Sequence, residues 1–211
     1  MPNPSKILGH VWNKDDDTLE LLAKPFPQEH PVTKRTILSY LGTVYDPLGI
    51  ISPTMAEGKH IYREACDEKK GWNAEVSLRL KNQWLRWTKQ LKDVRVPRSI
   101  ASFVGEIGAV HLHIFADASI LACCAAAIAV VEHEAGVSKG LLTSKSRISK
   151  RSTSIARLEL VSGHMAVKHG EEPQHCSPAM AHSNHQHLDG RYGSTILDNQ
   201  SWERMEGVCI K

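Results

Sequence analysis

Apolar and polar residues form two kinds of pattern in the first half of this 211-residue chain. Residues 7–12 and 18–22 alternate as two short strands joined by a polar turn, which predicts a β-hairpin. From residue 33 onward, apolar side chains recur at helical spacing in three segments, 33–45, 52–70 and 75–93. The first half is therefore predicted to be a hairpin followed by three helices.

Capping residues and prolines mark the ends of these helices. Thr33 is placed to cap the first helix, and Asp46-Pro47 ends it. Ser52 is expected to cap the second helix, because Pro53 then occupies the first helical position.

Tryptophans and leucines share one face of the third predicted helix. Leu80, Trp84, Trp87 and Leu91 recur in helical phase, and basic residues occupy the other faces. Such a stripe is typical of a buried core, with the basic residues as a solvated face. Stacking of the tryptophans on nucleic-acid bases, with phosphate contacts from the basic residues, is the alternative interpretation.

Strand-like alternation dominates the second half. Segments 112–118, 121–131 and 140–148 are joined by short turns and predict a three-stranded antiparallel meander. Residues 152–154 offer caps for a following helix. The buried face of that helix is expected to carry Leu158, Val161 and Met165.

Both periodicities end after Val167, where a run rich in His, Ser, Asn and Gly begins. We expect this segment to be disordered. The predicted fold class is α+β in three parts. Residues 1–98 form the hairpin and helical region, 99–167 the sheet and its helix, and 168–211 the tail.

The composition indicates the class of protein and its compartment, but says little about its function. The chain is 41% hydrophobic and 23% charged, with a net charge of +3, which fits a globular protein and permits a nucleic-acid partner without requiring one. No apolar run suits a signal peptide or a membrane span. Its five cysteines show no C-x-x-C spacing and predict free thiols in a reducing compartment. We expect an intracellular protein, cytoplasmic or nuclear, that is not secreted and contacts no membrane.

Two clusters suggest metal sites by content but lack the spacing that such sites need. The Asp15–Asp17 triplet lacks the register of an EF-hand loop and is interpreted as turn chemistry. A second cluster lacks paired zinc ligands across a defined turn or helix and is interpreted as accidental. Its members are His175, Cys176, His182, His185 and His187.

Asp117 and Glu159 are the carboxylates best placed for catalysis. Asp117 closes an alternating strand, and Glu159 stands 42 residues later at the start of a helical pattern. By themselves they fit a strand-end turn residue and a first-turn helix acid. Brought together on rigid supports, they fit a divalent-cation site.

Several motifs stand in one order along residues 6–167 and resemble the Pol polyprotein of Bel/Pao retrotransposons, a family often labelled as the A17 peptidases. The motifs are Ile7-Leu8-Gly9 with Trp12, residues 39–53, the tryptophan helix closed by Val96-Pro97-Arg98, Phe115-Ala116-Asp117-Ala118-Ser119, and Lys145-Ser146-Arg147 before Arg157-Leu158-Glu159-Leu160. This resemblance implies a reverse-transcriptase thumb or connection region over residues 1–98 and a truncated ribonuclease H-like domain over 99–167.

The same resemblance assigns roles to the site residues. Asp117 and Glu159 are implied to be the catalytic, Mg²⁺-binding pair of a nuclease that cuts the RNA strand of an RNA:DNA hybrid. Ser119, Lys145 and Arg147 are expected to contact the nucleic acid. Other Pol segments are further expected partners.

Departures from the family pattern lead us to expect impaired or absent activity. A fourth strand ending in a third carboxylate is not evident, because neither Asp189 nor Asp198 follows a convincing strand. An Asp-Thr-Gly or Asp-Ser-Gly protease turn is absent, and the polymerase aspartates would lie upstream, so neither proteolysis nor DNA synthesis is expected. Two alternatives to an active ribonuclease are left open. One is a non-catalytic module that binds nucleic acid or protein. The other is a protein without function that aggregates through its exposed sheet edge.

Overall fold

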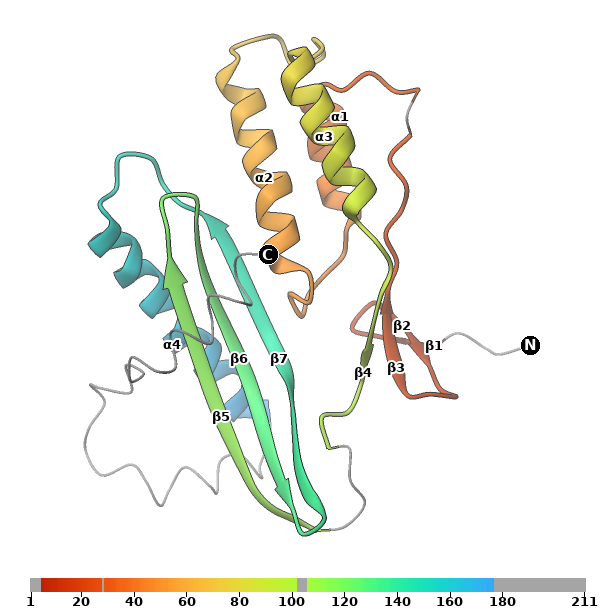
Figure 1. The fold of residues 1–211 in the computed structure, drawn as a ribbon, viewed down its shortest axis with the longest axis vertical. Coiled ribbons are helices and arrows are strands. Elements are labelled where there is room, and N and C mark those ends of the chain that lie inside the picture. The colour runs from red at the N-terminus through yellow and green to blue at the C-terminus, as the bar shows by residue number, and fades with distance from the viewer. Residues whose placement is uncertain (1–4, 28, 102–105, 177–211) are drawn as a thin grey trace.

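The computed structural model describes residues 5–27, 29–101 and 106–176. Within these ranges the chain forms four helices and two antiparallel sheets, as Figure 1 shows. This arrangement confirms the predicted α+β fold class. In chain order the elements are β1 (Ser5–Ile7), β2 (His10–Asn13), β3 (Thr18–Leu21), α1 (Lys34–Thr43), α2 (Ser52–Asp67), α3 (Leu78–Gln90), β4 (Val94–Pro97), β5 (Ile107–Ala118), β6 (Ala122–His133), β7 (Gly136–Ile148) and α4 (Ile155–Cys176).

The first sheet, β1-β2-β3-β4, is larger than the predicted hairpin. Residues 7–12 were expected as one strand, but a tight turn divides them. Leu8 and Gly9 both have positive φ, 50° and 82°, as a two-residue hairpin turn of this kind requires. Strand β4 pairs antiparallel with β3, with Val96 opposite Leu19. The local sequence pattern does not predict this strand, because three helices separate it from its partner β3 along the chain.

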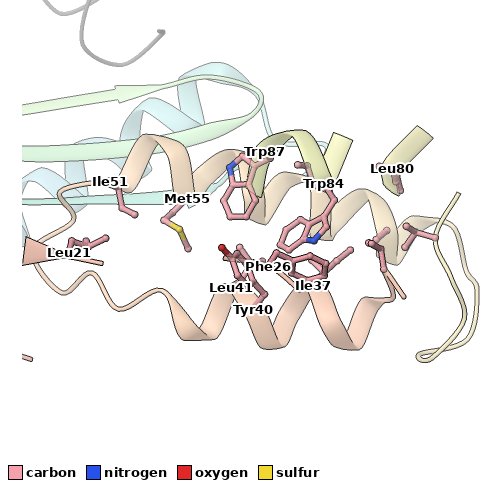
Figure 2. Packing of buried hydrophobic residues seen from close by; sticks show 14 residues of the cluster. Leu21, Phe26, Ile37, Tyr40, Leu41, Ile51, Met55, Leu80, Trp84 and Trp87 are labelled. Carbon is pink, nitrogen blue, oxygen red and sulfur yellow. The ribbon is translucent and has the colours of Figure 1, made fainter. Parts of the chain in front are cut away.

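Helices α1, α2 and α3 pack around the tryptophans, which Figure 2 shows from close by. Trp84 and Trp87 are 0% and 1% exposed, so the core interpretation of the aromatic stripe is confirmed. The indole Nε1 of Trp87 donates a 2.9 Å hydrogen bond to the carbonyl oxygen of Thr54 in α2. A Cβ atom on Gly58 would lie 2.4 Å from the Trp87 ring, so glycine permits this close approach of α2 and α3.

The helix ends agree with the sequence analysis at α1 and differ at α2. Thr33 caps α1 through a capping box. At α2 the cap is Ile51, which has no side-chain bond, and Ser52 is already helical, so the predicted serine cap is wrong. The Asp46 carboxylate instead accepts hydrogen bonds from the amides of Ile50 and Ile51, and these bonds organise the turn before α2.

The second sheet is the predicted meander, in the order β5-β6-β7, and helix α4 packs against β5 and β6. Small residues of β6, Cys123 and Ala125, lie in one cluster with Leu158 and Met165 of α4. Val161 is 42% exposed, so its predicted burial is wrong. Among residues 155–169 of α4, whose burial is described, the buried positions are Leu158, Ser162, Met165 and His169.

Helix α4 continues to Cys176, beyond Val167, where the sequence pattern ended it. Residues 177–211 lie outside the described part of the chain, as does the disorder predicted for them. Among the described residues, Cys66, Cys123 and Cys124 form no disulfide bond. No helix in the described ranges is both long and apolar enough to cross a membrane.

The helical region and the second sheet meet where the turn before α2 lies against β7. The Ser144 amide donates a 2.8 Å hydrogen bond to the carbonyl of Leu48, and the Ser144 hydroxyl donates a 2.6 Å bond to that of Gly49. The Ser146 hydroxyl donates a 2.8 Å bond to the carbonyl of Ser52. The two hydroxyls lie on the face of β7 that is turned away from α4, and the amide bond is made at the edge of the sheet.

Candidate functional site

Asp117 lies one residue before the end of β5, on the sheet face opposite α4. Its neighbours Ala116 and Ala118 pack against the cluster beneath α4, and side chains alternate between the two faces of a strand. The Asp117 side chain is half-buried, and its Oδ1 accepts a 2.7 Å hydrogen bond from the Ala118 amide. This bond restrains the side chain near the end of the strand.

Glu159 lies near the amino-terminal end of α4. It is exposed and stands beside the buried stripe that Leu158 and Met165 form on the sheet side of the helix. Its carbonyl oxygen accepts a 2.9 Å hydrogen bond from the Ser162 hydroxyl. The backbone at Glu159 is therefore held in place, while its carboxylate faces solvent.

Cys123 links the backbone segments that carry the two carboxylates. Ala118, next to Asp117, is paired with Cys123 across the β5–β6 ladder. The Cys123 thiol donates a 3.6 Å hydrogen bond to the carbonyl of Leu158, next to Glu159. Both segments thus lie at the same end of the second sheet, as the end of β5 and the start of α4 show in Figure 1.

The side chains of Asp117 and Glu159 do not start from the same side of the sheet. Asp117 starts from the face opposite α4, whereas Glu159 belongs to α4 itself. A shared ion therefore requires the carboxylates to reach around the end or the unpaired edge of β5. In the described residues β5 is an edge strand, so no neighbouring strand blocks that edge.

Ser119 closes the turn between β5 and β6. Its hydroxyl accepts 3.2 Å hydrogen bonds from the amides of Leu121 and Ala122, and its own amide donates to the Ala122 carbonyl. This hydroxyl is engaged in turn geometry. Its contact with nucleic acid stays a prediction.

Lys145 and Arg147 are exposed residues of β7. They are paired with Ala125 and Cys123, whose side chains lie on the α4 face of the sheet. Alternation therefore places both cations on that face, away from the face of Asp117. The structure does not bring the five predicted site residues onto one surface, but places the two cations on the side of Glu159.

A family model for the Pao retrotransposon-like RNaseH-like domain matches residues 33–183. The chain belongs to this Pao family. The matched residues include α1 to α3, the second sheet and α4. The Pao domain therefore covers both the helical region and the candidate site. Neither a curated protein nor a solved structure matches the chain.

A ribonuclease H-like Pao domain implies a site for Mg²⁺, and the described residues fit that ion only in part. Carboxylate oxygens are the ligands that Mg²⁺ prefers, so the chemistry of Asp117 and Glu159 is suitable. Within residues 5–27, 29–101 and 106–176, no group of three or more His, Cys, Asp or Glu residues is placed to hold a metal. Asp189 and Asp198 lie outside these ranges, as do His182, His185 and His187.

Sequence reasoning missed two polar residues that hold the backbone near Asp117, Ser149 and Arg63. Ser149, 3% exposed, donates from its hydroxyl to the Ser119 carbonyl at 2.6 Å. Arg63 of α2 donates from Nη1 to the Ser149 carbonyl at 2.7 Å. No local signal predicts these contacts, because they join segments far apart in the chain.

Proposed function

We propose that this Pao domain is the part of a retrotransposon Pol polyprotein that runs from the end of the reverse transcriptase into a ribonuclease H-like remnant. Its ancestral reaction is hydrolysis of the RNA strand of an RNA:DNA hybrid, and we infer that the present activity is impaired. The family match over residues 33–183 carries the proposal. The contact of Cys123 with Leu158 supports it, because it brings the segments of Asp117 and Glu159 together.

In this proposal each carboxylate has one task. Asp117, restrained by the Ala118 amide, and Glu159, on the rigid start of α4, would hold Mg²⁺ between them. Bound Mg²⁺ would activate water and stabilise the leaving oxygen. Contacts to the 2′-hydroxyl would select RNA over DNA, since that group distinguishes the two strands. A cytoplasmic or nuclear location would give access to such hybrids.

Cleavage of a labelled RNA:DNA hybrid in Mg²⁺ tests the enzymatic proposal. Slow cleavage is expected from the unaltered chain, and Asp117→Asn should abolish it because one cation ligand loses its charge. Glu134→Gln, an exposed change in the turn between β6 and β7, is the matched control and should cleave at the unaltered rate. Equal cleavage by the unaltered chain and Asp117→Asn would refute catalysis at this site.

A second candidate function is non-catalytic binding of nucleic acid or of another Pol segment. Two observations favour it. The described residues supply only two candidate carboxylates, and Lys145 and Arg147 are exposed together on one sheet face. Cations in such an arrangement can contact phosphates without any metal.

Hybrid binding at several salt concentrations separates the two functions. The binding function predicts affinity that falls with salt and survives Asp117→Asn. Lys145→Ala and Arg147→Ala should each lower the salt slope by about 1 if each contacts one phosphate. Affinity that is equal at low and high salt would count against this function.

A further inference from the structure

Ser149, which follows β7, joins its own segment to two others, the β5–β6 turn and α2. Its amide donates to the Leu121 carbonyl at 2.9 Å, and its hydroxyl donates to the Ser119 carbonyl at 2.6 Å, so it holds the β5–β6 turn. The carbonyl of Ser149 accepts the 2.7 Å bond from Arg63 of α2. All three polar groups of this buried serine are therefore engaged.

Cys123 extends these contacts to α4. Its thiol lies 3.6 Å from the Ser149 hydroxyl and 3.6 Å from the Leu158 carbonyl, to which it can donate. Cys123 is 2% exposed, so water does not compete for these groups. A chain of contacts thus runs from α2 past the end of β7 to the first turns of α4, although the Ser149 hydroxyl and the Cys123 thiol touch each other while each donates its proton elsewhere.

Both candidate carboxylates are connected to this chain of contacts through residues one or two positions away in the sequence. Asp117 lies two residues before Ser119, whose carbonyl the Ser149 hydroxyl holds. Glu159 directly follows Leu158, whose carbonyl the Cys123 thiol contacts. A shift at Ser149 therefore acts directly on the segment of Asp117, through the Ser119 carbonyl, and indirectly on the segment of Glu159, through Cys123.

We propose that Ser149 is a positioning residue, which sets the separation of the Asp117 and Glu159 backbones and itself depends on Arg63 of α2. The helical region then takes part in the site by fixing the loop between β7 and α4. This inference rests on the proposed function, because the separation matters when both carboxylates serve one cation. Supporting groups of this kind typically change metal affinity by about 10- to 100-fold when they are removed.

The test compares Ser149→Ala with Ser144→Ala. Both changes remove a 2.6 Å bond from a β7-side serine hydroxyl to a backbone carbonyl, but the bond of Ser144 goes to Gly49, away from the carboxylates. Amide hydrogen exchange is measured over residues 119–122 and 158–162. Ser149→Ala should raise exchange in both segments by about tenfold, because it removes the hydrogen bond that holds the Ser119 carbonyl, and Ser144→Ala should leave both unchanged.

Titration with Mg²⁺ alone, followed by calorimetry, provides the functional readout. Ser149→Ala should weaken Mg²⁺ binding by about tenfold or more, whereas Ser144→Ala should bind as the unaltered chain does. If the unaltered chain binds no Mg²⁺ and cuts no hybrid, the proposed function fails, and the exchange comparison still decides the positioning claim. If Ser149→Ala does not fold, Arg63→Met tests the position of Ser149 from the side of α2, because it removes the bond to the Ser149 carbonyl.

Two results would overturn the inference. One is exchange in Ser149→Ala that matches Ser144→Ala in either segment. The other is Mg²⁺ affinity that is unchanged in a folded Ser149→Ala protein whose parent binds the ion.

Discussion

At the scale of single residues, Gly49 shows how strictly the turn before α2 is fitted to β7. It has a φ of +74°, and a Cβ atom there would lie 1.9 Å from the Ser144 carbonyl oxygen. Its own carbonyl accepts the Ser144 hydroxyl. Glycine is thus required both by the backbone conformation and by the close approach of β7.

Gly49→Ala is therefore expected to destabilise the protein by roughly 2 kcal/mol or more, since backbone strain of this kind costs about 1–3 kcal/mol and the clash adds to it. Gly42→Ala is the control, because a Cβ atom there meets nothing within 4 Å. It lies near the end of α1 and should be neutral or stabilising by up to about 1 kcal/mol. Urea unfolding of both variants measures the difference, and equal stabilities would refute the fit described for Gly49.

At the scale of elements, the tryptophan face of α3 is the main support of the helical core. Trp84→Ala should lower the free energy of unfolding by about 3–5 kcal/mol, because it leaves a large cavity. Trp72, which is 40% exposed and lies under Arg35, offers the comparison. Trp72→Ala should cost about 1 kcal/mol or less. Similar losses in urea unfolding would contradict the assignment of Trp84 to the core.

The elements that sequence alone could predict are those with a strong local period. Helix α3 and strands β5 to β7 have such a period, and Thr33 carries its capping signal in its own side chain. Strand β4 was missed because its pairing with β3 is a long-range contact. Val161 was misplaced because burial follows Leu158, Ser162 and Met165, a stripe that includes a polar residue.

The candidate site was only partly predictable for the same reason. Motif order pointed to Asp117 and Glu159, and the meander brought their segments to one end of the sheet. The hydroxyl of Ser149 and the guanidinium of Arg63 contribute through tertiary hydrogen bonds. A single sequence carries no period or spacing that reveals such bonds.

At the scale of the whole molecule, exposed arginine–carboxylate pairs join distant segments. Arg151, beyond β7, binds Asp67 of α2 through both terminal guanidinium nitrogens, and Arg98, beyond β4, binds Asp17 in the turn before β3. Hydrogen bonds from these arginines hold the pKa of Asp67 and Asp17 below the ordinary value of 3.8. A carboxyl group with a lowered folded-state pKa stabilises the fold above its unfolded pKa, and this contribution is lost as pH falls through the folded value.

Acidification below about pH 4 is therefore expected to reduce stability. Arg151→Met should weaken this pH dependence, because the pKa of Asp67 then returns toward its ordinary value. Lys150→Met removes a neighbouring exposed cation and should leave the dependence as it was. Urea unfolding midpoints between about pH 5 and pH 2 measure the effect. An unchanged dependence in Arg151→Met would show that this pair does not join α2 to the second sheet in solution.

The proposed metal site requires Asp117 and Glu159 to bind the same cation. Titration with Mn²⁺, a paramagnetic substitute for Mg²⁺, reports this directly through NMR line broadening at the amides of Ala118 and Leu160. If the two carboxylates share one cation, both amide signals should broaden with one dissociation constant. Asp117→Asn or Glu159→Gln alone should then abolish the broadening of both signals. Broadening at one amide only, or broadening at both that survives the loss of either carboxylate, would contradict a shared site.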